Sequence, residues 1–291
     1  MSHWVGPVAG AGPDVSLRLA WHWEPLVVVP VVVAAALYAK GWWTASRRMP
    51  DRFGDRHLVA TMAGLATMVV ALASPLDALS ARLLLAHMTQ HLLLMTVAPP
   101  LLWMGAPVVP LLLGLPRPVR RAVTRALAMS PVQWLSHMLA HPVVSWVAFV
   151  VAFWVWHVPA LYDLAFRSDG WHHVEHACFF VTAGLFWRLV VLPWPARSAW
   201  PRWAMIPYLA LADLQNSVLA AILTFSDHLI YPAYGTLPPM WGLPALEDQA
   251  IAGVIMWVPG SLAFLLPVLW LVVTTLTAPR AVVRRAAPRP G

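Results

Sequence analysis

Seven apolar stretches, each separated from the next by a polar segment, run along the chain. A helix needs about 20 residues to cross the roughly 30 Å hydrocarbon core of a bilayer, and each stretch comes close to that length. The predicted spans are residues 26–43, 58–74, 83–103, 143–157, 173–192, 203–225 and 250–274. The pattern predicts an all-α polytopic membrane protein with a bundle of about seven transmembrane helices. We expect one transmembrane helical domain over residues 1–291.

The composition agrees with this architecture. Of the 291 residues, 60% are hydrophobic and 11% are charged, whereas soluble domains are about 25% charged. This balance excludes a soluble globular enzyme. It also excludes a disordered chain, because such chains lack the apolar residues that build a core. The single cysteine, Cys178, excludes an internal disulfide and a paired-thiol metal motif.

The basic residues predict the orientation of the bundle. The formal net charge is +7, but the arginines lie between apolar stretches, where they orient helices, so we expect no binding to nucleic acid. Sorting the 19 basic residues by the loops that hold them puts sixteen on one side and three on the other. This bias predicts an N-terminus outside and a C-terminus in the cytoplasm. The N-terminus lacks the pattern of a cleaved signal peptide, so the first stretch is expected to remain as a helix.

The longest predicted cytoplasmic connection covers residues 104–141. It contains several prolines, followed by an amphipathic segment at residues 119–129. Arginines face one side of that segment, and Val, Ala and Leu face the other. The pattern predicts an amphipathic helix that lies on the membrane surface.

The twelve histidines are distributed unevenly between the two predicted faces. Seven of them fall at or just inside the outer ends of the third to sixth spans: His87, His91, His157, His172, His173, His176 and His228. His87 and His91 are four residues apart, as are His172 and His176, so each pair lies on one face of its helix. His157 ends the fourth span at the same predicted level. Imidazoles from three helices are therefore expected to converge near the outer face.

Such a group predicts a metal site. Ionisable side chains are costly in a bilayer and usually serve function, and neutral imidazole is the commonest metal ligand. The candidate ligands are His87, His91, His157, His172 and His176, of which three or four would bind at once. Gln90 and Glu175 are expected to orient the imidazoles or adjust the local charge, with Asp248 as a more distant candidate for the same role. The alternative is that histidines at helix ends simply hydrogen-bond to water and lipid phosphates.

The residues leave the identity of the metal open. Imidazole suits copper, zinc and iron alike. Met95 lies deeper on the face of the third span that carries His87 and His91, where its thioether could hold Cu(I) or simply fill the core. Asp213 lies in the middle of the sixth span, where a structural network and a proton path are both consistent with its position.

Three other classes of protein can be compared with this pattern. A retinal protein is excluded, because it needs a lysine in the core of the bundle and the only lysine, Lys40, lies at the end of the first span. A transhelical di-haem cytochrome would need histidines near both faces, although a single haem at the outer face stays open. The sequence His172-x-x-Glu175-His176 matches the inverted zincin pattern, in which the glutamate activates water on zinc. An outward-facing zinc metallohydrolase is therefore the enzyme alternative.

Motifs in the third to seventh spans resemble a known family. The motifs are His87-Met-Thr-Gln-His91, Pro99-Pro100, Trp156-His157-x-Pro159-x-Leu161-Tyr162-Asp163, Glu175-His176, Gly184-x-x-Phe186-Trp187, Tyr231-Pro-x-Tyr234 and Asp248-Gln249-x-x-Gly253-x-x-Met256-Trp257. Together they resemble the multi-spanning CtaG family of cytochrome c oxidase assembly factors. The single-span copper chaperone that shares this name in other bacteria is a different protein with cysteine ligands, which this chain lacks.

The resemblance implies a multi-pass protein of the bacterial plasma membrane that is not an enzyme and that helps to mature a haem-copper terminal oxidase. It favours copper over zinc as the suspected ion and implies a role in binding or delivering that copper. The expected partners are oxidase subunits, an extracytoplasmic copper chaperone and membrane lipid. The alternative in another class is a metal-free membrane scaffold that holds oxidase subunits during maturation.

Overall fold

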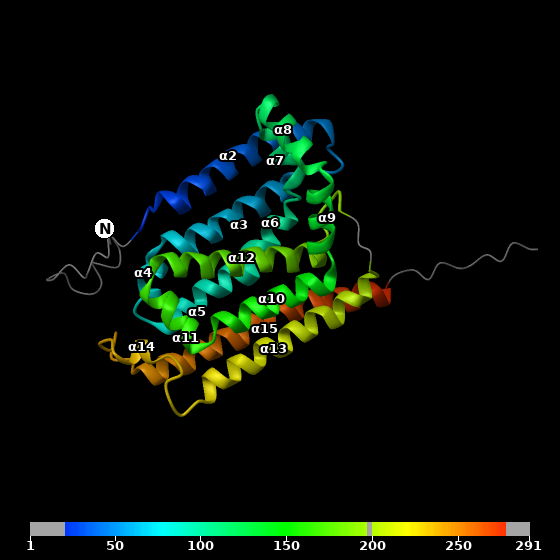
Figure 1. The fold of residues 1–291 in the computed structure, drawn as a ribbon. Coiled ribbons are helices and arrows are strands. Elements are labelled where there is room, and N and C mark those ends of the chain that lie inside the picture. The colour runs from blue at the N-terminus through cyan, green and yellow to red at the C-terminus, as the bar shows by residue number, and fades with distance from the viewer. Residues whose placement is uncertain (1–20, 197–199, 278–291) are drawn as a thin grey trace, which may run out of the picture.

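The computed structural model describes residues 21–196 and 200–277, and those residues form helices without any strand. The longer helices are α2 (Pro25–Arg48), α3 (Asp55–Ala73), α10 (Pro142–Trp156), α12 (Asp169–Val191), α13 (Met205–Phe225) and α15 (Ala245–Thr277). A further long helical segment is made of α5 (Leu84–Leu92), the π-helical turn η1 (Leu93–Val97) and α6 (Ala98–Met104). These segments lie side by side in a bundle (Figure 1).

The number of spans agrees with the sequence prediction. Among the described residues, five helices are long and apolar enough to cross a membrane, or up to seven if each of two bent pairs counts as one span. One pair is the segment Leu84–Met104 with α7 (Val108–Gly114), bent by 70°, and the other is α9 (Ser130–Leu139) with α10, bent by 69°. The all-helical, multi-span fold is thus confirmed, whereas the orientation of the termini stays a prediction.

Apolar side chains cover the outside of the bundle as well as its core. Phe225, Trp270 and Leu276 are 75%, 66% and 79% exposed. Inside, aromatic rings of α10, α12 and α15 pack together: Phe149 stacks on Phe186, and Phe264 meets both rings edge-on. An apolar surface around a packed core is the arrangement expected where lipid replaces water.

Two glycines allow α2 and α7 to pack backbone to backbone. A Cβ atom at Gly41 would overlap the carbonyl oxygen of Pro110, and one at Gly114 would overlap the carbonyl oxygen of Leu37. Small residues at such crossings let helices approach closely, and van der Waals contact then stabilises the pair in lipid. The close approach fixes α2 on the outside of the bundle (Figure 1).

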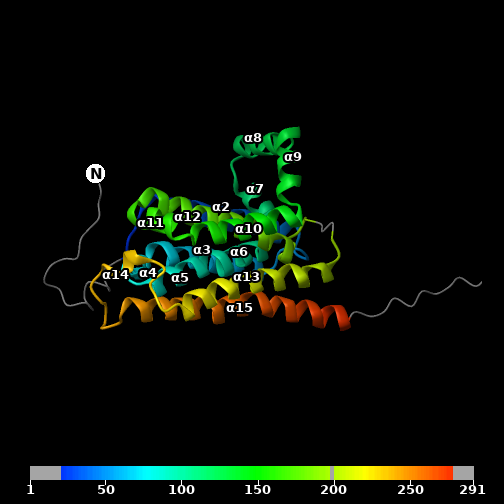
Figure 2. The same ribbon diagram turned by 60° about the horizontal axis from the view of Figure 1, so that its bottom comes forward.

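Short helices close the two ends of the bundle. At one end lie α4 (Pro75–Ser80), α11 (Pro159–Arg167) and α14 (Pro232–Gly235), and we call this the histidine end because α5 begins there. The opposite end carries α8 (Arg117–Leu127) and α9, which project from the bundle (Figure 2). The amphipathic helix predicted at residues 119–129 corresponds to α8, which has no buried residue. Its placement on a membrane surface stays a prediction.

Candidate metal centre

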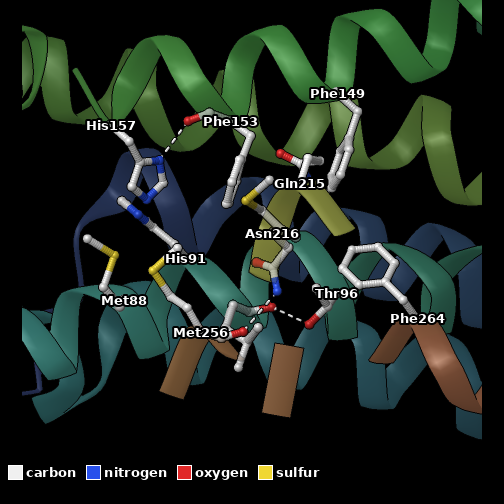
Figure 3. Close-up of a pocket in the computed structure, with 12 residues that line it drawn as sticks. Met88, His91, Thr96, Phe149, Phe153, His157, Gln215, Asn216, Met256 and Phe264 are labelled. Carbon is white, nitrogen blue, oxygen red and sulfur yellow. Dashed lines mark hydrogen bonds between the residues drawn. The ribbon is translucent and has the colours of Figure 1, made fainter. Parts of the chain in front are cut away.

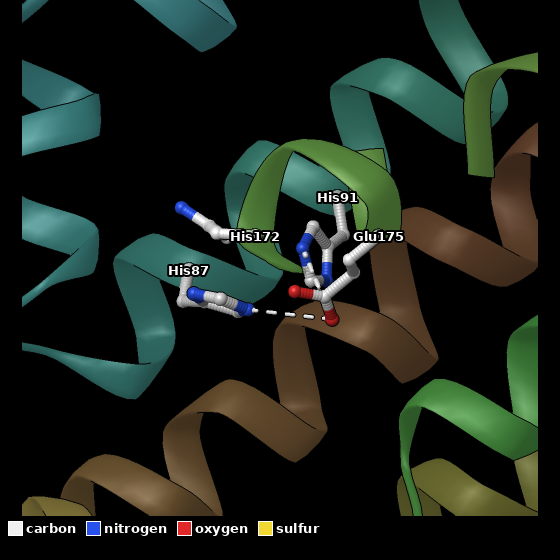
Figure 4. A group of neighbouring side chains, drawn as sticks. All are labelled: His87, His91, His172 and Glu175. Carbon is white, nitrogen blue, oxygen red and sulfur yellow. Dashed lines mark ion pairs between the residues drawn. The ribbon is translucent and has the colours of Figure 1, made fainter. Parts of the chain in front are cut away.

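Four potential ligands from two helices converge at the histidine end. His87 and His91 come from α5, and His172 and Glu175 come from α12. Each offers one ligand atom, and the four atoms all lie within 4.8 Å of one another (Figure 4). We call these residues the His/Glu cluster. The sequence placed His87 and His91 on one helix face, and the fold brings that face against α12.

Tryptophan hydrogen bonds hold the third span against α12. The indole N–H of Trp103 donates to the carbonyl oxygen of Gly184 at 2.7 Å. The indole N–H of Trp187 donates to the carbonyl oxygen of Met95 at 2.8 Å. Each bond satisfies an indole N–H that would otherwise be buried without an acceptor. Together the two bonds fix the position of the third span relative to α12 along the helix axes.

The start of α5 is fixed by a side chain from α15. The carboxylate of Asp248 accepts hydrogen bonds from the backbone N–H groups of Leu84, at 2.6 Å, and Leu85, at 3.0 Å. The first N–H groups of a helix have no partner within the helix, and an acidic side chain there is also favoured by the helix dipole. Asp248 therefore determines where α5 begins, less than one turn before His87.

An Asp248→Asn substitution is expected to destabilise the protein by about 1–3 kcal/mol, because the amide has a single acceptor oxygen and leaves one N–H of α5 without a partner. Thermal unfolding in detergent measures the change. Glu247→Gln is the matched control, since Glu247 is exposed in the same first turn of α15. Equal losses in both variants would mean that the helix dipole, rather than these two hydrogen bonds, carries the effect.

The cluster is buried and its polar atoms lack hydrogen-bond partners. His87 and His91 are each 3% exposed and Glu175 is 1% exposed, while His172 is only partly buried. Oε1 of Glu175 lies 3.7 Å from Nε2 of His91 and 4.0 Å from Nε2 of His87, too far for hydrogen bonds. Both carboxylate oxygens are without a partner, as are the Nε2 atoms of all three histidines. Leaving each such atom unpaired costs about 1–3 kcal/mol, and more for a charged group.

A metal ion fits this donor set. Ligand atoms about 2.0–2.1 Å from a tetrahedral ion lie roughly 3.4 Å apart, so side-chain shifts of the order of 1 Å would complete the site. Three imidazoles and one carboxylate suit Zn(II) or Cu(II). His172 is the one partly buried residue of the four.

The other two predicted ligands lie beside the cluster. The ring of His176 is 4.1 Å from that of His172 and 5.3 Å from that of His91, measured between centroids, and its Nε2 atom has no partner. His157 donates from Nδ1 to the carbonyl oxygen of Phe153 at 2.6 Å. It faces a separate cavity (Figure 3). Neither residue belongs to the group whose ligand atoms lie within 4.8 Å of one another.

The three residues expected to support the ligands have different positions. Glu175 lies inside the cluster as a potential ligand. Gln90 donates from Nε2 to the carbonyl oxygen of Ala71 at 2.7 Å and to Asp77 at 2.8 Å. Burial raises the pKa of Asp77, which the hydrogen bond from Gln90 partly offsets. Asp248 acts through the start of α5. Gln90 and Asp248 thus bond to groups on neighbouring helices and not to the candidate ligands themselves. The sequence did not predict which groups these would be.

Three buried tyrosines for which the sequence predicted no role lie beside the cluster, and one of them contacts it. The ring of Tyr162 lies 5.1 Å from that of His87 between centroids. Its hydroxyl lies 3.0 Å from that of Tyr234, which donates to the carbonyl oxygen of Ser80 at 2.8 Å. Tyr231 donates to the carbonyl oxygen of His157 at 3.1 Å. The sequence feature that could have identified these tyrosines is that all three belong to the family-like motifs around Pro159 and Pro232.

Comparison with known proteins decides the family. The sequence profile of the cytochrome c oxidase caa3 assembly factors matches residues 36–278, which include every helix of the site. This chain belongs to that family. The predicted resemblance to the CtaG family is confirmed. No solved structure matches this chain.

The chain also resembles longer mycobacterial proteins. Uncharacterised proteins of Mycobacterium bovis and Mycobacterium tuberculosis are each 28% identical over 282 residues, which is 92% of this chain and 40% of each relative. An uncharacterised protein of Mycobacterium leprae is 25% identical over 255 residues, which is 81% of this chain and 36% of the relative. The chain therefore spans about 40% of the length of these relatives.

Proposed function

We propose that this caa3 assembly factor binds copper at the His/Glu cluster and supplies it to a haem-copper terminal oxidase in the bacterial plasma membrane. The observation that supports the proposal is the convergence of buried donor atoms without partners at one end of the bundle. A single cation would satisfy three imidazole nitrogens and a carboxylate together. Family membership favours copper as that cation. An extracytoplasmic donor protein would load the site, and oxidase subunits would receive the ion.

The donor set also bears on the oxidation state of the bound copper. A carboxylate oxygen is a hard ligand and imidazole is intermediate, whereas Cu(I) prefers thiolates and thioethers. The cluster should therefore hold Cu(II) better than Cu(I). A site without thiolates suits a protein that must release its metal.

The arrangement gives less support to a zinc hydrolase. That mechanism needs His172 and His176 as ligands and leaves Glu175 free to activate water. Here Glu175 lies with His87, His91 and His172, while His176 lies outside that group. A haem is also poorly accommodated. The cavity below the cluster has a volume of about 30 Å³, and pockets for organic ligands hold about 300–1,000 Å³.

A His87→Ala, His172→Ala variant is expected to yield a terminal oxidase that is assembled but short of copper. The reason is that each substitution removes a donor atom from the site that would supply the ion. The ratio of copper to haem in oxidase purified from cells carrying the variant measures this effect. The matched control is His228→Ala, because His228 is an exposed histidine that pairs with Asp227 away from the cluster.

A smaller amount of oxidase with a normal ratio of copper to haem would contradict copper supply. It would favour the metal-free scaffold instead. Normal oxidase in normal amounts would contradict both roles for the cluster.

A further inference from the structure

A small cavity lies directly below the His/Glu cluster, between α5, α10, α13 and α15. Its volume is about 30 Å³, which exceeds the roughly 10–15 Å³ that a cavity needs to hold one water molecule. Aromatic and aliphatic side chains form much of its wall. The remaining lining includes the thioethers of Met88, Met95 and Met256 and the imidazoles of His91 and His157 (Figure 3). Thr96, Gln215 and Asn216 also line it, and the amide oxygen of Gln215 is buried without a partner. The cavity is therefore large enough for one ion and offers sulfur and nitrogen donors as well as oxygen donors.

The tautomer of His157 leaves a ligand atom available. Its Nδ1 atom donates to the carbonyl oxygen of Phe153 at 2.6 Å, so the proton lies on Nδ1. Nε2 consequently carries a lone pair, and it is buried without a partner. A histidine whose other nitrogen is bonded to a backbone carbonyl has the usual orientation of a metal ligand. His157 itself is 6% exposed.

His91 borders both the cavity and the cluster. Both of its ring nitrogens are buried without partners. Nε2 lies 3.7 Å from Oε1 of Glu175, within the cluster, and the same side chain lines the cavity. Figure 3 shows the rings of His91 and His157 at the same end of the cavity as the side chains of Met88 and Met256. Two imidazoles and two thioethers thus share one end of a space that fits an ion.

The chemistry of this end differs from that of the cluster. Thioether sulfur is a soft ligand that selects Cu(I), and imidazole also accepts copper. A methionine in a core often only fills space. Space filling does not account for the buried nitrogen atoms without a hydrogen bond beside those sulfurs, which are both ring nitrogens of His91 and Nε2 of His157. The cluster, by contrast, has a carboxylate and lacks sulfur among its four members.

We propose that the cavity is a second metal site, which binds Cu(I) through Met88, Met256, His91 and His157, while the His/Glu cluster binds divalent ions. Met95 lines the same cavity and is a further thioether donor. The inference rests on the proposed function only for the identity of the metal. It assigns four of the five predicted histidine ligands to two neighbouring sites that have His91 in common, and His176 belongs to neither.

The test is a Met88→Leu, Met256→Leu variant of the full chain in detergent. Cu(I) affinity is measured without oxygen by competition with a chromophoric Cu(I) chelator, and Zn(II) affinity by competition with a zinc chelator. We expect Cu(I) affinity to fall at least tenfold and Zn(II) affinity to stay unchanged. X-ray absorption at the copper edge should show sulfur neighbours in the unsubstituted protein and lose them in the variant. Leucine nearly conserves the volume of methionine, so the fold should persist.

Met205→Leu is the matched control, because Met205 is 2% exposed in α13 but does not line the cavity. A second variant, His157→Phe, removes the Nε2 ligand and keeps an aromatic ring. Unchanged Cu(I) affinity in both cavity variants, or copper without sulfur neighbours in the unsubstituted protein, would overturn the second site. A Glu175→Gln variant distinguishes the cavity site from the His/Glu cluster, because Glu175 belongs only to the cluster. It should lower the affinity for Zn(II) and leave the affinity for Cu(I) unchanged. If the cavity variants lost Zn(II) binding but kept Cu(I) binding, the assignment of Cu(I) to the cavity would also be contradicted.

Discussion

Replacing His91 by alanine is expected to lower the affinity of the purified protein for Zn(II) or Cu(II) by at least about 100-fold. His91 is 3% exposed, and its Nε2 atom lies 3.7 Å from Glu175 at the centre of the cluster. Loss of a residue that merely orients a ligand costs 10–100-fold in metal affinity, so loss of a ligand should cost more. Competition against a chelator of known affinity, with metal content checked by elemental analysis, measures the change.

His173→Ala is the control for that substitution. His173 follows His172 directly on α12, but its Nε2 atom lies 3.2 Å from Glu24. Its removal should leave metal affinity unchanged. Equal and negligible metal in the unsubstituted protein and the His91→Ala variant would remove the basis for copper binding and leave the scaffold role.

A Gly41→Leu substitution is expected to destabilise the fold by at least about 3 kcal/mol, at the upper end of what overpacked side chains cost. Even a Cβ atom at this position would overlap the carbonyl oxygen of Pro110, which is backbone and cannot rotate away. The two helices would have to separate and lose their contact. The yield of folded protein and its thermal unfolding in detergent measure the loss.

Gly184→Ala is the control for that substitution, because Gly184 lies in α12 where a side chain has room. A Cβ atom there meets nothing within 4 Å. Because alanine is the better helix former, the substitution should be neutral or stabilise by up to about 1 kcal/mol. Comparable losses at both glycines would mean that helix propensity, rather than the crossing of α2 and α7, governs the effect.

The spans were predictable because each depends on hydrophobic length within one segment. The predicted sixth span, residues 203–225, differs from α13 (Met205–Phe225) by two residues at its start. The three short helices of the histidine end were not predicted. Each begins with a proline and has fewer than ten residues, too few to give a periodic signal. The bends of 70° and 69° lie at the two ends of the predicted connection over residues 104–141, but the direction in which the chain turns was not predicted.

The candidate site was predictable only within each helix. The spacing of four residues correctly placed His87 beside His91, with ring centroids 4.1 Å apart. Periodicity says nothing about the relative rotation of two helices. That rotation depends on contacts distant in sequence, such as the bond from Trp187 to the Met95 carbonyl across 92 residues. The separation of His157 from the cluster, and the inclusion of Glu175 in it, follow from such contacts.

The π-helical turn η1 divides the third span into α5, which carries His87 and His91, and α6, which packs on α3. Above it lies the histidine pair, and below it α6 packs on α3, where Leu102 touches Gly64 closely. Each residue of an α-helix advances by about 100° around the axis. Deleting one residue from Leu93–Val97 would therefore swing both imidazoles about a quarter of a circle while α6 kept its contacts. Over evolution, single-residue insertions or deletions at this turn would change the direction of the His87 and His91 side chains while the packing of the other helices stayed the same.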